Sequence, residues 1–367
     1  MPATDTHATA ALAEADRLMT VCNSCRYCEG LCAVFPAMEM RRSFADADLN
    51  YLANLCHGCG ACYYDCQYSP PHEFLVNVPK TLAEVRAQSY AHLAWPAAFS
   101  GLFARNGLTV AVVAALSVAA YIVGFVGLNN PGAVFTAQTS FYALMPHNAM
   151  ALLFGLVFAY AIVAMGMGVR RFWRETAGTG QSGVAPGSIW QAMRDAATLK
   201  YLDGGGVGCY NEDDRPKDRR RPAHHFTSYG FMLCLAATSV ATLYHYLLGR
   251  EAPYPWYDLP VVLGTLGGIG LVIGPIGLLM AKRVRDPAVV DDERRGMDVA
   301  FILMLLLTSV TGLALLLLRG TGGMGILLSV HLGVVFALFL TMPYGKFVHG
   351  IYRFAALVRY AQERREM

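Results

Sequence analysis

Residues 22–32 read Cys22-Asn-Ser-Cys25-Arg-Tyr-Cys28-Glu-Gly-Leu-Cys32, and residues 56–66 repeat this spacing as Cys56-His-Gly-Cys59-Gly-Ala-Cys62-Tyr-Tyr-Asp-Cys66. This C-x2-C-x2-C-x3-C run is typical of bacterial ferredoxins, and four thiolates are the number that a cubane [4Fe–4S] cluster binds. We therefore predict two [4Fe–4S] clusters. Structural zinc is disfavoured because zinc sites usually join two cysteine pairs across a longer span. Disulfides are disfavoured because no charged-then-apolar signal segment appears in the first 100 residues.

The fourth cysteine of each run is predicted to bind the cluster of the other run, as it does in two-cluster ferredoxins. The proline that usually follows this cysteine is replaced by Ala33 and Gln67, so the set of ligands is better determined than the cross-over. The first cysteine group, predicted to hold cluster 1, is Cys22, Cys25, Cys28 and Cys66. The second cysteine group, predicted to hold cluster 2, is Cys56, Cys59, Cys62 and Cys32.

The rest of the chain has the composition of a membrane protein. Only 15% of residues are charged, 55% are apolar, and the net charge of +3 gives no reason to expect a nucleic-acid partner. Several stretches contain no Asp, Glu, Lys or Arg and are long enough to span a bilayer as helices. They cover roughly 107–128, 148–169, 226–248, 259–281, 299–318 and 324–344. Small residues in the fourth, from Gly264 to Gly274, predict close contact with another helix.

Basic residues in the loops predict the orientation of these spans. Loops 170–223 and 282–297 and the tail 346–367 together hold twenty Lys and Arg, whereas the loops on the other side hold two. The positive-inside rule therefore predicts that both termini lie on the cytoplasmic side. We expect the membrane to be a bacterial inner membrane.

The expected fold is mainly α-helical and has three parts. Residues 1–105 form a cytoplasmic, helical, ferredoxin-like two-cluster domain that ends in an interfacial lead-in. Residues 106–345 form a six-helix transmembrane bundle with the cytoplasmic loop 170–223, and residues 346–367 form a basic cytoplasmic tail, expected as a surface helix.

Histidines near the span ends predict b-type haem, because ionisable residues inside a membrane are costly and usually functional. The third span starts at His224-His225 and ends near His245, and the sixth carries His331 and leads to His349. The two spans are antiparallel, so the histidines pair by depth. We predict an outer haem between His245 and His331, and an inner haem between His224 and His349, with His225 as the alternative inner ligand. The protein would hold one or two haems, since each iron needs two axial nitrogens.

Two further histidines are interpreted differently. His147 has no obvious partner at the start of the second span and is expected to be an interface residue. His57 lies inside the second cysteine run, where we expect it to tune its cluster by hydrogen bonding rather than to bind iron.

Several motifs together resemble the tricarballylate (citrate) utilisation protein B family. They are the two cysteine runs, Gly204–Cys209 with Tyr210, His224-His225-x3-Tyr229-Gly230-Phe231-x2-Cys234, and Tyr244-His245-Tyr246. The resemblance implies a membrane electron-transfer protein that reoxidises a soluble FAD-dependent dehydrogenase, which oxidises tricarballylate to cis-aconitate. Electrons would pass through the clusters and haem to the quinone pool. More distantly, the membrane bundle is similar to nitrate reductase gamma subunits, and the cluster domain to heterodisulfide reductase subunits.

The residues themselves show electron carriers and no substrate chemistry. No nucleophile–base pair or flavin motif is present, and Gly204-Gly205-Gly206 is not the G-x-G-x-x-G fingerprint of a dinucleotide site. Whether the chain is an enzyme in its own right stays open. Quinone reductase activity is expected only together with its flavoprotein partner. Two alternatives remain: a heterodisulfide or thiol reductase subunit that uses Cys209 or Cys234, and a membrane-bound iron–sulfur redox sensor. Segment 212–221 either helps to seat the flavoprotein or only anchors the third span.

Overall fold

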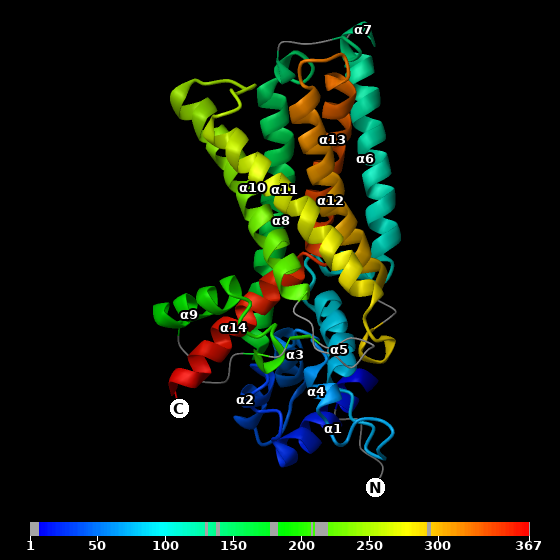
Figure 1. Cartoon of the computed structure of the whole chain (residues 1–367), viewed down its shortest axis with the longest axis vertical. Coiled ribbons are helices and arrows are strands. Elements are labelled where there is room, and N and C mark those ends of the chain that lie inside the picture. The colour runs from blue at the N-terminus through cyan, green and yellow to red at the C-terminus, as the bar shows by residue number, and fades with distance from the viewer. Residues whose placement is uncertain are drawn as a thin grey trace.

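The fold is known from a computed structural model that describes residues 7–128, 131–136, 140–176, 183–206, 208–209, 219–291 and 295–366. Within these ranges the chain is helical and contains no β-strand, which confirms the mainly α prediction. Figure 1 shows a tall helical bundle standing on a small helical domain, with the N-terminus at the foot of that domain.

The small domain positions both cysteine runs at the ends of helices. Its helices are α1 (Ala10–Cys25), α2 (Val34–Glu39), α3 (Asp46–Leu55), α4 (Ala61–Tyr64) and α5 (Val78–Leu93). The Thr9 side chain caps α1 by accepting from the backbone N–H of Leu12, and α1 ends where Arg26 adopts the left-handed conformation. Leu18, Leu49 and Leu82 are fully buried between the helices and fix their packing.

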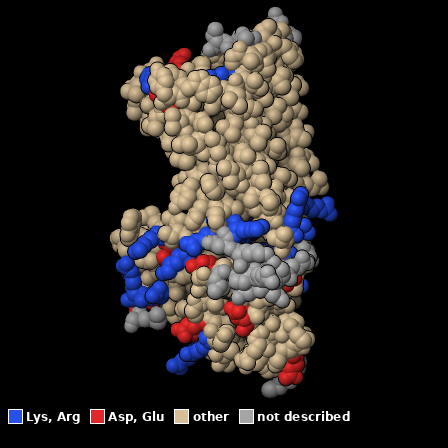
Figure 2. All heavy atoms as spheres, in the orientation of Figure 1, with Lys and Arg blue, Asp and Glu red and all other residues tan. Residues whose placement is uncertain are grey.

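Within the described residues the bundle contains six helices long and apolar enough to cross a membrane, as the hydropathy of the sequence predicts. They are α6 (Asn106–Leu128), α8 (His147–Thr176), α10 (Arg220–Leu248), α11 (Leu259–Arg283), α12 (Arg295–Leu318) and α13 (Met324–Thr341). Many of their large apolar side chains, such as Leu116 and Leu156, point outward. Figure 2 shows an upper body almost free of charge with Lys and Arg gathered at its lower margin. The chain is therefore a multi-pass membrane protein.

Shorter elements connect these helices, and the helix α14 follows the last span and contacts both the small domain and the membrane helices. They are η1 (Ala97–Phe103), α7 (Pro131–Val134), η2 (Phe141–Ala143), α9 (Pro186–Ala197), η3 (Gly204–Gly206), η4 (Pro287–Val289), η6 (Met342–Tyr344) and α14 (Val348–Glu366). Figure 1 shows α14 running beneath the membrane helices, beside α9 and above α3.

Glycines allow α10 and α11 to pack with their backbones nearly in contact, as the small-residue pattern predicts. A Cβ atom added at Gly230 would lie 2.9 Å from both the carbonyl oxygen of Gly267 and the backbone nitrogen of Leu271. Gly274 leaves the same kind of room for Thr227. The contact surface between the two helices therefore depends on these glycines.

Replacing Gly230 with Ala should destabilise the bundle by about 1–3 kcal/mol, because the new methyl group meets backbone atoms that cannot rotate away. Loss of helical signal on heating in detergent measures the effect. Gly166→Ala is the matched control, since Gly166 is also helical but has no atom near its added Cβ. Equal melting temperatures for the two variants would contradict the close packing.

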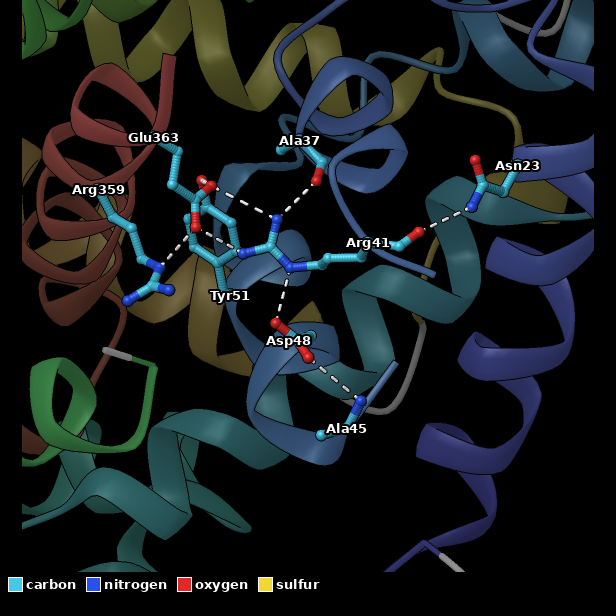
Figure 3. A network of polar contacts seen from close by, with 8 residues as sticks. All are labelled: Asn23, Ala37, Arg41, Ala45, Asp48, Tyr51, Arg359 and Glu363. Atoms are coloured by element: carbon cyan, nitrogen blue, oxygen red, sulfur yellow. Dashed lines mark hydrogen bonds and ion pairs between the residues drawn. The ribbon is translucent and has the colours of Figure 1, made fainter. Parts of the chain in front are cut away.

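The expectation that the tail forms a surface helix is wrong. Most of α14 is buried, including Tyr352, Ala356 and Tyr360. A polar network fastens its last turn to the small domain, as Figure 3 shows. Arg41 Nη2 donates to Glu363 Oε1 at 2.7 Å and Arg41 Nε to Asp48 at 2.6 Å, while Tyr51 and Arg359 also donate to the Glu363 carboxylate. The sequence pattern hid this role because two of the basic residues of α14, Arg353 and Arg359, are buried instead of facing water.

Replacing Glu363 with Ala should cost about 3–5 kcal/mol of stability, because the nearly buried Arg41 and Arg359 would lose the carboxylate that balances them. Thermal unfolding and proteolysis within α14 report the loss. Glu14→Ala is the control: it removes an exposed ion pair with Arg17, worth about 1 kcal/mol or less. A Glu363 variant as stable as the Glu14 variant would show that the network does not hold α14.

Candidate cofactor sites

The first cysteine group surrounds a cavity of about 270 Å³ at the foot of the small domain. Cys22 and Cys25 come from the end of α1, Cys28 from the following loop, and Cys66 from just beyond α4. The backbone N–H of Tyr68 donates to the Cys66 thiol at 3.4 Å. Cys25 is exposed, so this cavity opens to solvent. The fold thus brings the fourth cysteine of the second run to the first three of the first run.

The second cysteine group lies deeper, beneath the membrane helices. Cys32, Cys56, Cys59 and Cys62 line a narrow pocket of about 20 Å³ together with Gly58 and Tyr201. The four thiols match the donor set of a cluster, although the space between them is smaller than at the first group. Cys62 lines both pockets and therefore lies between the two groups.

Burial sets the protonation of these thiols. It raises the pKa of Cys22 and Cys28 to about 12 and that of Cys59 to about 11, with neighbouring cysteines adding to the shift. Such thiols stay protonated at neutral pH until metal binding releases the proton. In the described part of the chain no three His, Cys, Asp or Glu side chains converge on a single ion. A cubane does not require this, because each of its irons takes one cysteine.

Four arginines hold the backbone that carries the second group, which the sequence analysis did not foresee. Arg86 and Arg353 donate to the carbonyl of Cys56, Arg220 donates to those of His57 and Gly58, and Arg285 donates to that of Gly58. These arginines come from segments far apart in the chain, so no local pattern could reveal them.

A larger cavity of about 390 Å³ lies between the small domain and the lower ends of the membrane helices. His57, His224 and His349 line it, and His225 does not. The His349 Nδ1 lies 3.1 Å from the Tyr90 hydroxyl, and the His224 Nδ1 lies 3.3 Å from the Ser228 hydroxyl. Partners on Nδ1 leave Nε2 of each ring available, which is how proteins commonly orient a histidine that binds metal.

The lining of this junction cavity has both apolar and cationic character. Phe231, Phe301, Leu305 and Phe347 form an apolar part. Lys282 and Lys346 approach the same carboxylate, that of Asp298, at 2.5 and 2.8 Å. Burial, then Arg353 and Lys346, holds the pKa of His349 well below its usual range, so the ring is neutral. Two imidazoles with available Nε2 atoms, apolar walls and surplus cations suit a b haem with its two propionates.

The outer histidines have different neighbours from one another. The His245 ring stacks on that of His147, with centroids 3.5 Å apart and planes inclined by 19°. The expectation that His147 has no partner is therefore wrong. The His331 Nδ1 instead lies 3.0 Å from the Thr311 hydroxyl of α12. Figure 1 shows the upper ends of α10 and α13 on different sides of the bundle, and the His245–His331 pair stays a prediction.

The glycine-rich loop packs on the second cysteine group rather than standing alone. Cys209 is buried with Leu199 and Leu202 against Cys59. An added Cβ at Gly205 would lie 3.0 Å from the Leu31 side chain, and Gly205 adopts φ 79°, a conformation that favours glycine. Cys234 faces Gly267 inside the α10–α11 contact, as a small packing residue. Tyr210 and segment 211–218 lie outside the described residues.

An N-terminal domain with ferredoxin-like cysteine runs below six membrane helices defines a membrane-bound iron–sulfur electron-transfer protein. The Fer4-like domain of citrate utilization protein B matches residues 15–92, and the citrate utilization protein B family matches residues 101–367. A citrate utilization protein B from Escherichia coli is 54% identical over 354 residues, which cover 96% of this chain and 93% of that protein. The chain belongs to the citrate utilization protein B family. No solved structure matches it.

Proposed function

We propose that this protein reoxidises a soluble FAD-dependent dehydrogenase and passes the electrons through two [4Fe–4S] clusters and b haem to the quinone pool. The observation that supports this most directly is the order of the sites. The exposed first cysteine group, the buried second group and the junction cavity follow one another toward the membrane, linked by Cys62 and His57. Such an order suits stepwise transfer of single electrons.

The two cysteine groups would hold the two clusters, with Cys66 and Cys32 exchanged between the runs. Support comes from the two pockets, each lined by the first three cysteines of one run and the fourth of the other, with Cys62 lining the first pocket as well. When bound, the clusters accept and donate one electron at a time. Beside cluster 2 Cys56 is buried, whereas cluster 1 would lie beside the exposed Cys25 and Tyr27, which is 73% exposed. Electrons from the flavoprotein would therefore enter at cluster 1.

The junction cavity would hold the inner haem between His224 and His349. Tyr90 and Ser228 orient the two rings, and Lys282 and Lys346 would bind the propionates. His57 lies next to Cys56 and lines the same cavity, so cluster 2 and the haem would be direct neighbours. The acidic part of segment 212–221 lies outside the described residues, whereas Arg220 and Arg221 hydrogen-bond to backbone carbonyls.

A thiol reductase is less well supported, because Cys209 is only 5% exposed and lies on the second cysteine group. The gathering of Lys and Arg at one end of the spans supports a cytoplasmic cluster domain in the bacterial inner membrane.

Mixing the anaerobically purified protein with reduced flavoprotein tests the proposal. Absorbance should show cluster reduction, then haem reduction, and a soluble quinone analogue should reoxidise both. Cys209→Ser should leave this flux unchanged, which separates the proposal from a thiol mechanism. Reduction that stops at the clusters, with no electrons delivered to quinone, would favour a redox sensor instead.

A further inference from the structure

The loop that carries the second cysteine group is surrounded by positive charge. Arg220 donates from Nη1 to the Gly58 carbonyl at 3.0 Å and from Nη2 to the His57 carbonyl at 3.1 Å. Arg285 donates to the Gly58 carbonyl at 2.6 Å, and Arg86 to the Cys56 carbonyl at 2.6 Å. Arg353, which is 8% exposed, also donates to Cys56. Four guanidinium groups therefore converge on three consecutive residues.

These hydrogen bonds do not neutralise the arginines, because their acceptors are carbonyl oxygens and not carboxylates. Two carboxylates, Asp291 and Asp298, line the adjoining junction cavity. Asp298 pairs with both Lys282 and Lys346, so these three side chains together carry one net positive charge. The surroundings of the second cysteine group are strongly cationic as a result.

The first cysteine group has a less cationic environment. Among the residues that line its cavity, the only charged side chain is that of Asp65, and neither Lys nor Arg is present. Asp65 directly precedes Cys66 and lines the same cavity as the four thiols. One arginine, Arg26, donates to a carbonyl of the first run, that of Asn23 at 3.0 Å, whereas four arginines converge on the second run. The second cysteine group therefore has the more positive surroundings.

Reduction adds one negative charge to a cluster, so nearby cations stabilise the reduced form and nearby carboxylates destabilise it. Burial by itself destabilises the added negative charge, so at cluster 2 it opposes the stabilisation of the reduced form by the arginines. Charges buried beside a cluster are little screened by solvent, however, so four of them outweigh that effect. The difference in charge therefore favours cluster 2 as the electron acceptor.

We propose that the four arginines around Cys56–Gly58 hold the reduction potential of cluster 2 above that of cluster 1, which directs electrons inward from the exposed cluster. The inference rests on the proposed pair of clusters and adds a direction to it. In the step itself one electron leaves reduced cluster 1 and reduces cluster 2, and no bond forms or breaks. The arginines act as positioning residues that bias this equilibrium.

Redox titration followed by paramagnetic resonance tests the proposal on the full-length protein. Arg220→Gln should shift the distribution of an electron between the clusters at least tenfold toward cluster 1, which corresponds to a fall of about 59 mV in the potential of cluster 2. Arg220→Lys should recover most of the shift because it keeps the charge. The neighbouring Arg221→Gln is the control, since Arg221 binds the Thr198 carbonyl instead. A Cys59→Ser variant identifies the signal of cluster 2.

Non-haem iron and sulfide measured on each sample separate two kinds of failure. A protein without two clusters would overturn the proposed function itself. Two intact clusters whose potentials are the same in Arg220→Gln and Arg221→Gln would overturn only the electrostatic proposal. If Arg220→Gln does not fold, Arg285→Gln provides the same test at the Gly58 carbonyl. Asp65→Asn should raise the potential of cluster 1 and leave that of cluster 2 unchanged.

Discussion

Protein with Ser in place of Cys59 is expected to lose half of its non-haem iron and to stop accepting electrons from the flavoprotein. Cys59 lies in the second cysteine group with Cys32, Cys56 and Cys62, and a serine hydroxyl is a poor replacement for a thiolate ligand. Cluster 2 would be absent, and cluster 1 would have no route to the junction cavity. Iron and acid-labile sulfide analysis, together with the low-temperature resonance spectrum, measures the loss.

Cys234→Ser is the matched control for Cys59→Ser, because Cys234 lies within α10 and should leave the iron content unchanged. Cys32→Ser and Cys66→Ser then test the exchange of ligands between the runs. Cys66→Ser should affect the same cluster as Cys22→Ser, and Cys32→Ser the same cluster as Cys59→Ser. Full iron content in Cys59→Ser would show that the second run does not bind a cluster.

The second large effect is expected at the junction cavity, where His349→Ala and His224→Ala should each remove the same haem species. Both rings line this cavity and have their Nδ1 atoms occupied by Tyr90 and Ser228, so loss of either would remove one of the two residues that would hold the haem. Difference spectra of the reduced protein, with haem extracted and quantified, follow the loss. Tyr90→Phe should weaken haem retention about tenfold or more by freeing the His349 ring.

His225→Ala is the control for the inner haem and should retain it, since His225 lies outside the cavity lining. Loss of the inner haem in His225→Ala but not in His224→Ala would contradict the assignment. His331→Ala and His245→Ala test the predicted outer haem, and His147→Ala should be compared with them because His147 stacks on His245. A spectral species lost in both the His147 and His245 variants, but kept in His331→Ala, would exclude the predicted outer pair.

The sequence predicted features that depend on residues close together in the chain, and it missed features that depend on contacts between distant residues. The cysteine spacing predicted the two groups of thiols, because three ligands of each set lie within one short loop. Composition predicted six spans, since the bilayer imposes its length on each helix separately. The buried position of α14 was missed, because Glu363 meets Arg41 across most of the chain length. The antiparallel order of the third and sixth spans predicted that His245 and His331 lie at the same depth, but it did not predict which helices are neighbours, and depth alone does not define a pair.

The buried contact between α14 and the small domain also determines when this domain can complete its packing during synthesis. The small domain is translated before the six spans, and α14 follows them in chain order. Arg41 and Tyr51 therefore cannot meet Glu363 until every span has left the ribosome. Docking of α14 then joins these residues, so a helix made after the six spans completes the packing of a domain made before them.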